Sequence, residues 1–367
     1  MADDNTFIQP GKWDPIWFMS FCTDKELERI SNPQNPKDIL LRKRADIVAD
    51  HVRYMRVFIK RRDVIRNYTF ENCFSDIHYK NVIKKLDFIN KEKVKSITYG
   101  DIFENDVNGI AWIENGNRFI SMNESLKYFL YFCCLAFIPE WFDVPTYVRI
   151  NSAIIATRIY YHKEAMDFEL DPRGIIPKNI HHYINECIQQ EMQFVAGHEI
   201  AHHLCNHLNE SKIIKKNILY EYDKEYELPI FNIDQKQEFE ADLNSIKLPK
   251  YTKKEFSKIL EGAIRWFHAL EFIEKIDDVV NPGKEEQYQT HPSAEQRLKQ
   301  ILSEITPTQD INISDLHESI NWATSLSDFI SNDISTNYEK YDMYGSVYLD
   351  KPNSKWRGRE LIDRKDY

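Results

Sequence analysis

The strongest constraint on the fold is a proline-free stretch from Lys178 to Leu208. Gly197 is its only glycine, so we expect one long α-helix. The stretch contains His198 and His202, four positions apart, with Glu199 directly after the first histidine. Side chains at positions i and i+4 project side by side from a helix, so both imidazoles can reach one cation.

The His-Glu-x-x-His pattern predicts a zinc site. Neutral imidazole nitrogen binds Zn²⁺ at about 2.0–2.1 Å. Glu199 would point toward the open coordination position and take a proton from zinc-bound water, whose pKa falls to about 7 in such sites. The same pattern also fits a helix with two surface histidines that bind no metal. A catalytic zinc site needs a third protein ligand, which the rest of the chain must supply.

A third ligand is predicted on a second helix. The metzincin pattern is excluded, because Cys205 stands where its glycine would be and Leu208 where its last histidine would be. Downstream, Glu238 and Asp242 are four positions apart and share a face of an expected helix. Glu238 can bind the metal while Asp242 accepts the N–H of a ligand imidazole. Glu240 lies about 200° around that helix from Glu238, so only one of the two can face the ion.

Three motifs occur in the order of a known family. They are "HEIAH", then "EFEAD", then "THPSAEQRL" from Thr290 to Leu298. Together they resemble the M48 group of gluzincin metallopeptidases, which carry HExxH, then ExxAD on a second helix, then a His-Pro segment with a later arginine. The resemblance covers about residues 145 to 305. It implies a zinc ion bound by three side chains: His198, His202 and Glu238.

The His-Pro segment extends this resemblance to further residues. Pro292 suits the first turn of a helix, which places His291 at the helix start and Arg297 in the second turn. The resemblance implies that His291 approaches the zinc cleft and contacts the metal or the developing oxyanion. It also implies that Asp242 and Arg297 lie directly behind the ligands. In the alternative interpretation the His-Pro pair only caps a helix and Arg297 makes a structural ion pair.

The remaining patterns indicate a mainly helical α+β fold of the zincin type, with the active helix beside a small β-sheet and extra helical flanks. Asn115-Gly116 within Gly109–Ser121 predicts a β-hairpin. The β-branched and aromatic stretch Tyr147–Tyr161 predicts one or two more strands of that sheet. Further helices are expected at 124–137, 235–246, 253–276, 292–305 and 314–330. We expect three regions: a helical region at 1–105, the metallopeptidase domain at 106–310, and a C-terminal helix with a polar tail at 311–367.

Two segments have alternative interpretations. Asp38–Ile65 predicts one amphipathic helix with a solvated basic face, or a contact with an acidic partner or membrane surface. Asn209–Asp234 is polar and irregular, and it joins the two ligand-bearing helices. We predict that it borders the substrate groove, with Tyr220, Tyr222 and Tyr226 as contacts; the alternative is a solvated connector.

Other histidines and the tryptophans have plainer interpretations. His203 and His207, also four positions apart, would lie on another face of the long helix and offer a weaker second metal site. His181 and His182 are expected at the surface. Four tryptophans are expected mainly in the core: Trp112, Trp141, Trp266 and Trp322.

Composition narrows the function class. Lys and Arg number 48 against 58 Asp and Glu, for a formal net charge of -10, which argues against a nucleic-acid partner. Six cysteines without CxxC spacing favour a reducing compartment. The apolar run Tyr128–Ile138 is too short for a transmembrane helix, which needs about 20 residues, and no signal peptide is recognised. We therefore expect a cytoplasmic protein, whose oligomeric state the sequence does not determine.

The combined prediction is a zinc-dependent endopeptidase of narrow substrate range. Its substrate would be a protein or peptide, hydrolysed by metal-activated water with Glu199 as general base. The layout is also similar to the Lit-type phage-exclusion peptidases, which cleave one host protein. The alternative is a catalytically silent zincin-fold protein that binds metal and acts as a regulator or interaction partner. A four-ligand structural zinc site is disfavoured, because the usual Cys/His spacing is absent.

Overall fold

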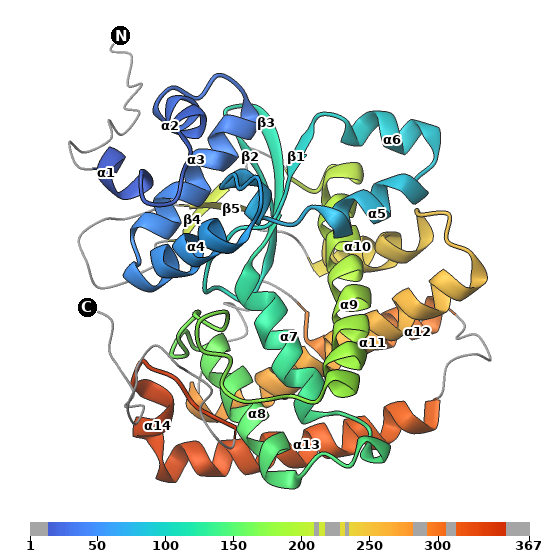
Figure 1. Ribbon diagram of the computed structural model, residues 1–367. Helices are drawn as coiled ribbons and strands as arrows, with labels where there is room; N and C mark the ends of the chain where they lie inside the picture. The colour runs from blue at the N-terminus through green and yellow to red at the C-terminus, as the bar shows by residue number, and fades with distance from the viewer. Residues whose placement is uncertain are drawn as a thin grey trace.

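The chain is mainly helical, with a small three-stranded sheet among the helices, as expected (Figure 1). The computed structural model describes residues 14–208, 213–216, 228–231, 235–281, 292–305 and 313–349. Its α-helices are α1 (Asp14–Phe18), α2 (Asp24–Ser31), α3 (Pro36–Ala49), α4 (Val52–Val64), α5 (Ile77–Lys85), α6 (Phe88–Val94), α7 (Glu124–Ala136), α8 (Thr146–Tyr160), α9 (Lys178–Leu204), α10 (Gln235–Lys247), α11 (Lys253–Val280), α12 (Ala294–Glu304), α13 (Ile313–Thr336) and α14 (Tyr338–Asp342).

Helix α9 is the structural centre. It contacts α5, α6, α7, α10 and α11 as well as two strands of the sheet. Two glycines allow close helix approach there. A Cβ on Gly262 of α11 would lie 2.7 Å from the backbone of Gln190, and a Cβ on Gly197 would lie 3.2 Å from Ser245 of α10. The helices that carry the predicted ligands are therefore packed backbone against backbone.

The sheet contains the predicted hairpin. Strands β1 (Ile97–Tyr99), β2 (Gly109–Glu114) and β3 (Asn117–Met122) are arranged in the order β1-β3-β2, with β1 parallel and β2 antiparallel to β3. The turn residues Asn115 and Gly116 have φ values of 50° and 74°. Positive φ at both positions is the requirement of a type I′ turn, so the hairpin prediction is confirmed.

The strand prediction for Tyr147–Tyr161 is wrong. This segment is helix α8, which begins after Pro145 and packs against α7. Ser152–Ile159 is buried at every position, so the β-branched side chains pack on all sides of the helix. Strand propensity is a weak preference that tertiary packing overrides, and here the helix buries the whole apolar run.

The single helix predicted for Asp38–Ile65 is two helices, α3 and α4. The chain breaks between them at Asp50 and His51, and His51 is extended with φ −129° and ψ 114°. The basic face is also not simply solvated. Arg53 is buried near Asp167, and Arg61 is buried against Glu124 at 2.6 Å. These arginines are used inside the fold, which corrects the prediction of a solvated basic face.

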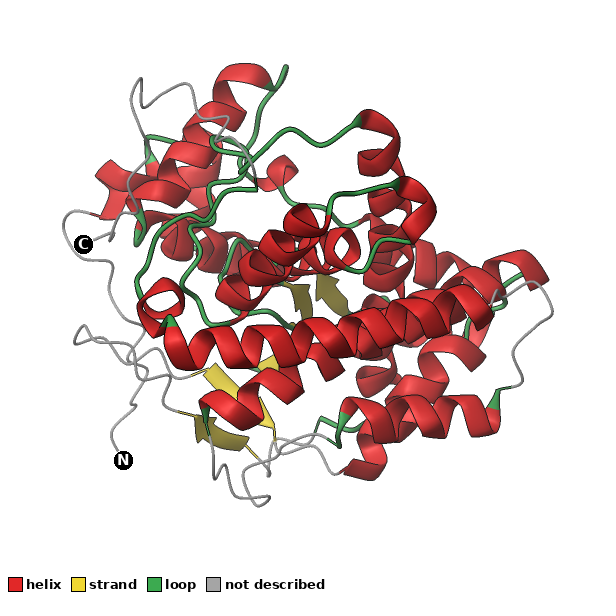
Figure 2. Cartoon of the chain, turned by 90° about the horizontal axis from the view of Figure 1, so that it is seen from below, coloured by secondary structure: helices red, strands yellow, loops and turns green. Residues whose placement is uncertain are grey.

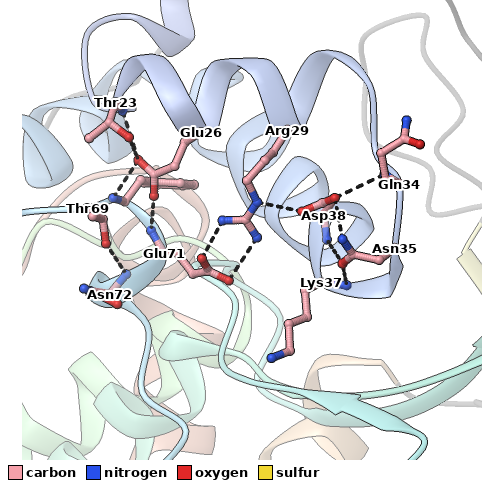
Figure 3. Close-up of polar contacts among 11 residues, drawn as sticks. Thr23, Glu26, Arg29, Gln34, Asn35, Lys37, Asp38, Thr69, Glu71 and Asn72 are labelled. Carbon is pink, nitrogen blue, oxygen red and sulfur yellow. Dashed lines mark hydrogen bonds and ion pairs between the residues drawn. The ribbon is translucent and has the colours of Figure 1, made fainter.

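Polar contacts join the first helices to the rest of the N-terminal region. Figure 3 shows Arg29 of α2 between Asp38, at the start of α3, and Glu71 of the short 3-10 helix η1 (Glu71–Cys73). Glu26 accepts hydrogen bonds from Thr23 and from the backbone N–H of Glu71. Carboxylates therefore hold the predicted N-terminal helical region together. They accept hydrogen bonds from backbone N–H groups at helix starts and from the guanidinium of Arg29.

The remaining helices begin and end within a few residues of the expected positions, except that α13 continues to Thr336. Figure 2 shows that helices make up most of the chain. Within the described ranges, no helix is long and apolar enough to cross a membrane. The tryptophan prediction is right for Trp112 and Trp266, which are buried, and Trp322 is half-buried. It is wrong for Trp141, which lies in the short 3-10 helix η2 (Glu140–Phe142) with 60% of its surface exposed.

Candidate metal centre

Three side chains from two helices converge at one buried point. His198 and His202 lie in the last turns of α9, and Glu238 lies in the first turn of α10. The two Nε2 atoms are 2.9 Å apart. The Glu238 carboxylate is 3.6 Å from Nε2 of His198 and 3.5 Å from Nε2 of His202. All three side chains are buried.

This arrangement fits a zinc ion. Ligand atoms placed tetrahedrally at about 2.0–2.1 Å from zinc lie about 3.4 Å from one another. The observed spacings of 2.9 to 3.6 Å lie on both sides of that value. Two imidazole nitrogens and a carboxylate oxygen are also the donor types that zinc accepts. The three side chains thus could hold the ion that the sequence motifs imply.

Asp242 and Arg297 lie directly behind the ligands. Asp242 is 2.8 Å from Nδ1 of His198, and Arg297 of α12 donates two hydrogen bonds of 2.7 Å to the Asp242 carboxylate. Arg297 also comes within 3.3 Å of Glu238. Because Asp242 accepts the Nδ1 proton of His198, the lone pair of Nε2 is directed at the other two donors. Arg297 in turn orients both carboxylates.

The charges in this cluster shift one another's pKa values. Burial alone would lower the pKa of His198, but the ion pair with Asp242 outweighs it, and the pKa lies above its usual value. Burial, followed by the charge of His198, lowers the pKa of His202 well below its usual value. For Asp242, burial is outweighed by Arg297 and His198, so its pKa is lowered. The acid behind His198 therefore stays ionised and can keep accepting a proton from the ring.

Glu199 is a buried carboxyl beside the three donors. Burial raises its pKa to about 7, while the charge of His198 opposes the shift. Strand β2 begins against it: a Cβ on Gly109 would lie 3.1 Å from Oε1 of Glu199 and 2.9 Å from Val195. A carboxyl with a pKa near neutrality can both take up and release a proton, as a general base must.

The region after α9 differs from the sequence prediction. The helix ends at Leu204 rather than continuing to Leu208, and Asn206 reverses the chain with φ 56°. His203 and His207 therefore do not share a helix face. His203 contacts the carbonyl of Phe119 at 2.9 Å, so the predicted His203–His207 pair does not form.

His207 instead turns back toward the candidate metal centre. Its Nδ1 is 3.0 Å from Nδ1 of His202, and its Nε2 is 3.2 Å from the carboxylate of Glu240. Glu238, and not Glu240, belongs to the group of three donors, as the helical period predicts. Sequence reasoning missed this role of His207, and it missed Gly109. Neither position has a spacing signal, because the chain reversal at Asn206 and the approach of β2 are tertiary features.

Some predicted site residues lie outside the described residues. These are His291 and the three tyrosines Tyr220, Tyr222 and Tyr226. The described part of the connecting stretch is not irregular, because β4 (Ile213–Lys216) and β5 (Leu228–Phe231) form an antiparallel pair. Strand β5 contacts β2, whose first residue is Gly109. The connecting stretch therefore comes back to the strand that begins beside Glu199.

Comparisons with models of known protein families, with curated proteins and with solved structures gave no match. The chemistry of this centre must therefore be read from its own residues.

Proposed function

We propose that this protein is a zinc-dependent endopeptidase. The observation that carries the proposal is the convergence of His198, His202 and Glu238 at one buried point, with Glu199 beside it. The likeness of the three sequence motifs to those of gluzincin peptidases supports the same function. The substrate is a protein or peptide, and the range is narrow.

Each nearby side chain has a task in this proposal. A zinc ion held by His198, His202 and Glu238 would supply the positive charge that activates water and polarises the peptide carbonyl. Glu199 accepts the proton of the attacking water and delivers it to the leaving amine. Its pKa of about 7 suits both steps near neutral pH. Asp242 keeps the His198 ring in the orientation and tautomer that a ligand needs.

The sheet offers a place for the substrate backbone. Strand β2 stands at the edge of the order β1-β3-β2, and its first residue contacts the neighbourhood of Glu199. An extended peptide can add to such an edge through main-chain hydrogen bonds. Strand β5 contacts β2, which supports a role for the connecting stretch Asn209–Asp234 at the same groove.

The decisive test replaces the base and spares the ligands. Glu199→Gln should retain zinc, measured by metal analysis, and lose cleavage of denatured casein by about 10²–10⁴-fold. Glu186→Gln, the same change at an exposed position of the same helix, is the matched control and should behave as wild type.

If casein resists the wild-type protein, cellular proteins that accumulate in cleaved form on its expression provide the substrate, with Glu199→Gln as the inactive partner. A zinc-loaded wild-type protein that cleaves neither casein nor any cellular protein would overturn the peptidase proposal. That outcome would favour a metal-binding regulator without turnover.

A further inference from the structure

A second set of metal-binding side chains lies beside the first centre. Cys205 caps the end of α9, His207 follows it in the loop, and Glu240 projects from α10. One donor atom from each of the three lies within 4.8 Å of the others. The imidazole of His207 is 3.2 Å from the Glu240 carboxylate. This set shares no residue with the group around Glu238.

We propose that Cys205, His207 and Glu240 form a second Zn²⁺ site. A thiolate, an imidazole and a carboxylate are a donor set that suits zinc, whereas the thiolate disfavours magnesium and calcium. Cys205 binds as thiolate and releases its proton to solvent. The three protein ligands leave a fourth position for water.

The burial of the three side chains supports a site that an ion can enter and leave. His207 is buried, Cys205 is half-buried, and the Glu240 side chain is 57% exposed. The buried His207 is therefore held in place by the fold, while the Glu240 carboxylate faces solvent. Asn244 donates a hydrogen bond of 3.2 Å to the Cys205 sulfur, which would help to hold the thiolate.

A hydrogen bond links the two sites. Nδ1 of His207 is 3.0 Å from Nδ1 of His202, a predicted ligand of the first ion. The second ion must also displace the contact between His207 and Glu240. With both ions bound through Nε2, His202 and His207 would each carry the proton on Nδ1, so this hydrogen bond would be lost. We therefore expect the second ion to bind more weakly than the first, and filling of one site to lower the affinity of the other by the same factor in both directions.

Cobalt distinguishes the sites, because only the second contains sulfur. The metal-free full chain should bind two equivalents of Co²⁺ in a titration. Binding of the second equivalent should produce a thiolate-to-cobalt charge-transfer band in the near ultraviolet. Cys205→Ser should lose this band and the second equivalent. Cys73→Ser, which removes another partly buried thiol, is the matched control and should keep both. Zn²⁺ should displace the cobalt and remove the band.

Two further variants make the result decisive. Glu240→Gln changes an exposed side chain, so folding is not threatened, and the second equivalent should bind at least about tenfold more weakly. Glu238→Gln should lose the first equivalent and keep the thiolate band. Saturation of the wild-type chain at one equivalent without the band would overturn the second site and leave the proposed peptidase untouched. If the wild-type chain shows the thiolate band but binds no further ion at His198, His202 and Glu238, the result would count against the peptidase and not against this site.

Discussion

Two of the clusters of buried charged side chains, one around Glu164 and one around Glu238, differ in the groups that face the acids. Around Glu164, each acid faces a guanidinium: Arg173 is 2.8 Å from both Glu164 and Asp167, and Arg158 is 3.0 Å from Glu164. These four side chains are almost fully inaccessible to solvent. Around Glu238, by contrast, two of the facing groups are imidazoles.

The two clusters differ in whether the group that faces the acid can give up its proton and bind a metal ion instead. A guanidinium stays protonated and has no lone pair to offer, so the Glu164 cluster can only hold the chain together. An imidazole can exchange its proton for a cation. In the second cluster the one guanidinium, Arg297, is directed mainly at Asp242, behind the ring of His198. Burial of charge alone therefore does not mark a metal site; the kind of donor does.

The largest expected effect is loss of the third ligand. Glu238→Gln should weaken zinc binding by more than the 10–100-fold typical of residues behind ligands, since it removes a ligand itself. Glu240→Ala, on the same helix, should keep the first zinc ion. Metal content after dialysis against a weak chelator measures both. The chelator also removes the more weakly bound second ion proposed at Cys205, His207 and Glu240 from every variant. Loss of the remaining, tightly bound zinc ion from Glu240→Ala would therefore contradict the assignment of Glu238.

The next effect concerns stability alone. Arg173→Met should lower the free energy of unfolding by about 3–5 kcal/mol, because it leaves Glu164 and Asp167 buried without this partner. Zinc per folded chain should not change. Urea denaturation measures the loss. Arg62→Met, which removes a half-exposed ion pair with Asp63, should cost at most about 1 kcal/mol. If Arg173→Met lowered the free energy of unfolding as little as Arg62→Met, the proposed contrast between the two clusters would be wrong.

A smaller effect is expected from the residue behind His198. Asp242→Asn keeps the size of the side chain but weakens its hold on the Nδ1 proton, so zinc affinity should fall about 10–100-fold. Cleavage should fall with zinc occupancy and recover when zinc is added in excess. Unchanged zinc affinity, measured by competition with a coloured chelator, would show that the contact is structural only.

The smallest effect tests the approach of β2. In Gly109→Ala the new methyl would press on Val195 and on the Glu199 carboxylate, at 2.9 and 3.1 Å. Such overpacking costs about 1–3 kcal/mol. We expect the turnover number for cleavage to fall while zinc content stays at the wild-type level. A variant with wild-type turnover would mean that β2 yields without disturbing Glu199.

Local sequence determined a large part of this protein. The His198–His202 spacing needs only one helix to place two imidazoles side by side, and Asn115-Gly116 needs only its own backbone to form the hairpin turn. The pairing of Glu238 with Asp242 follows from the same helical period. These features depend on residues within a few positions of one another, so a single sequence is sufficient to predict them.

Tertiary structure decided the rest, because it depends on partners distant in the sequence. Helix α8 has the composition of a strand and becomes a helix because its stretch Ser152–Ile159 is buried on all sides. Local preference also does not predict the break between α3 and α4 at His51. Nor does it predict the turn that brings His207 back to His202, or the contact of Arg297 with Asp242. Burial then raises the pKa of Glu199 to about 7, a property that no residue pattern carries, since it arises from the exclusion of water by the packed chain.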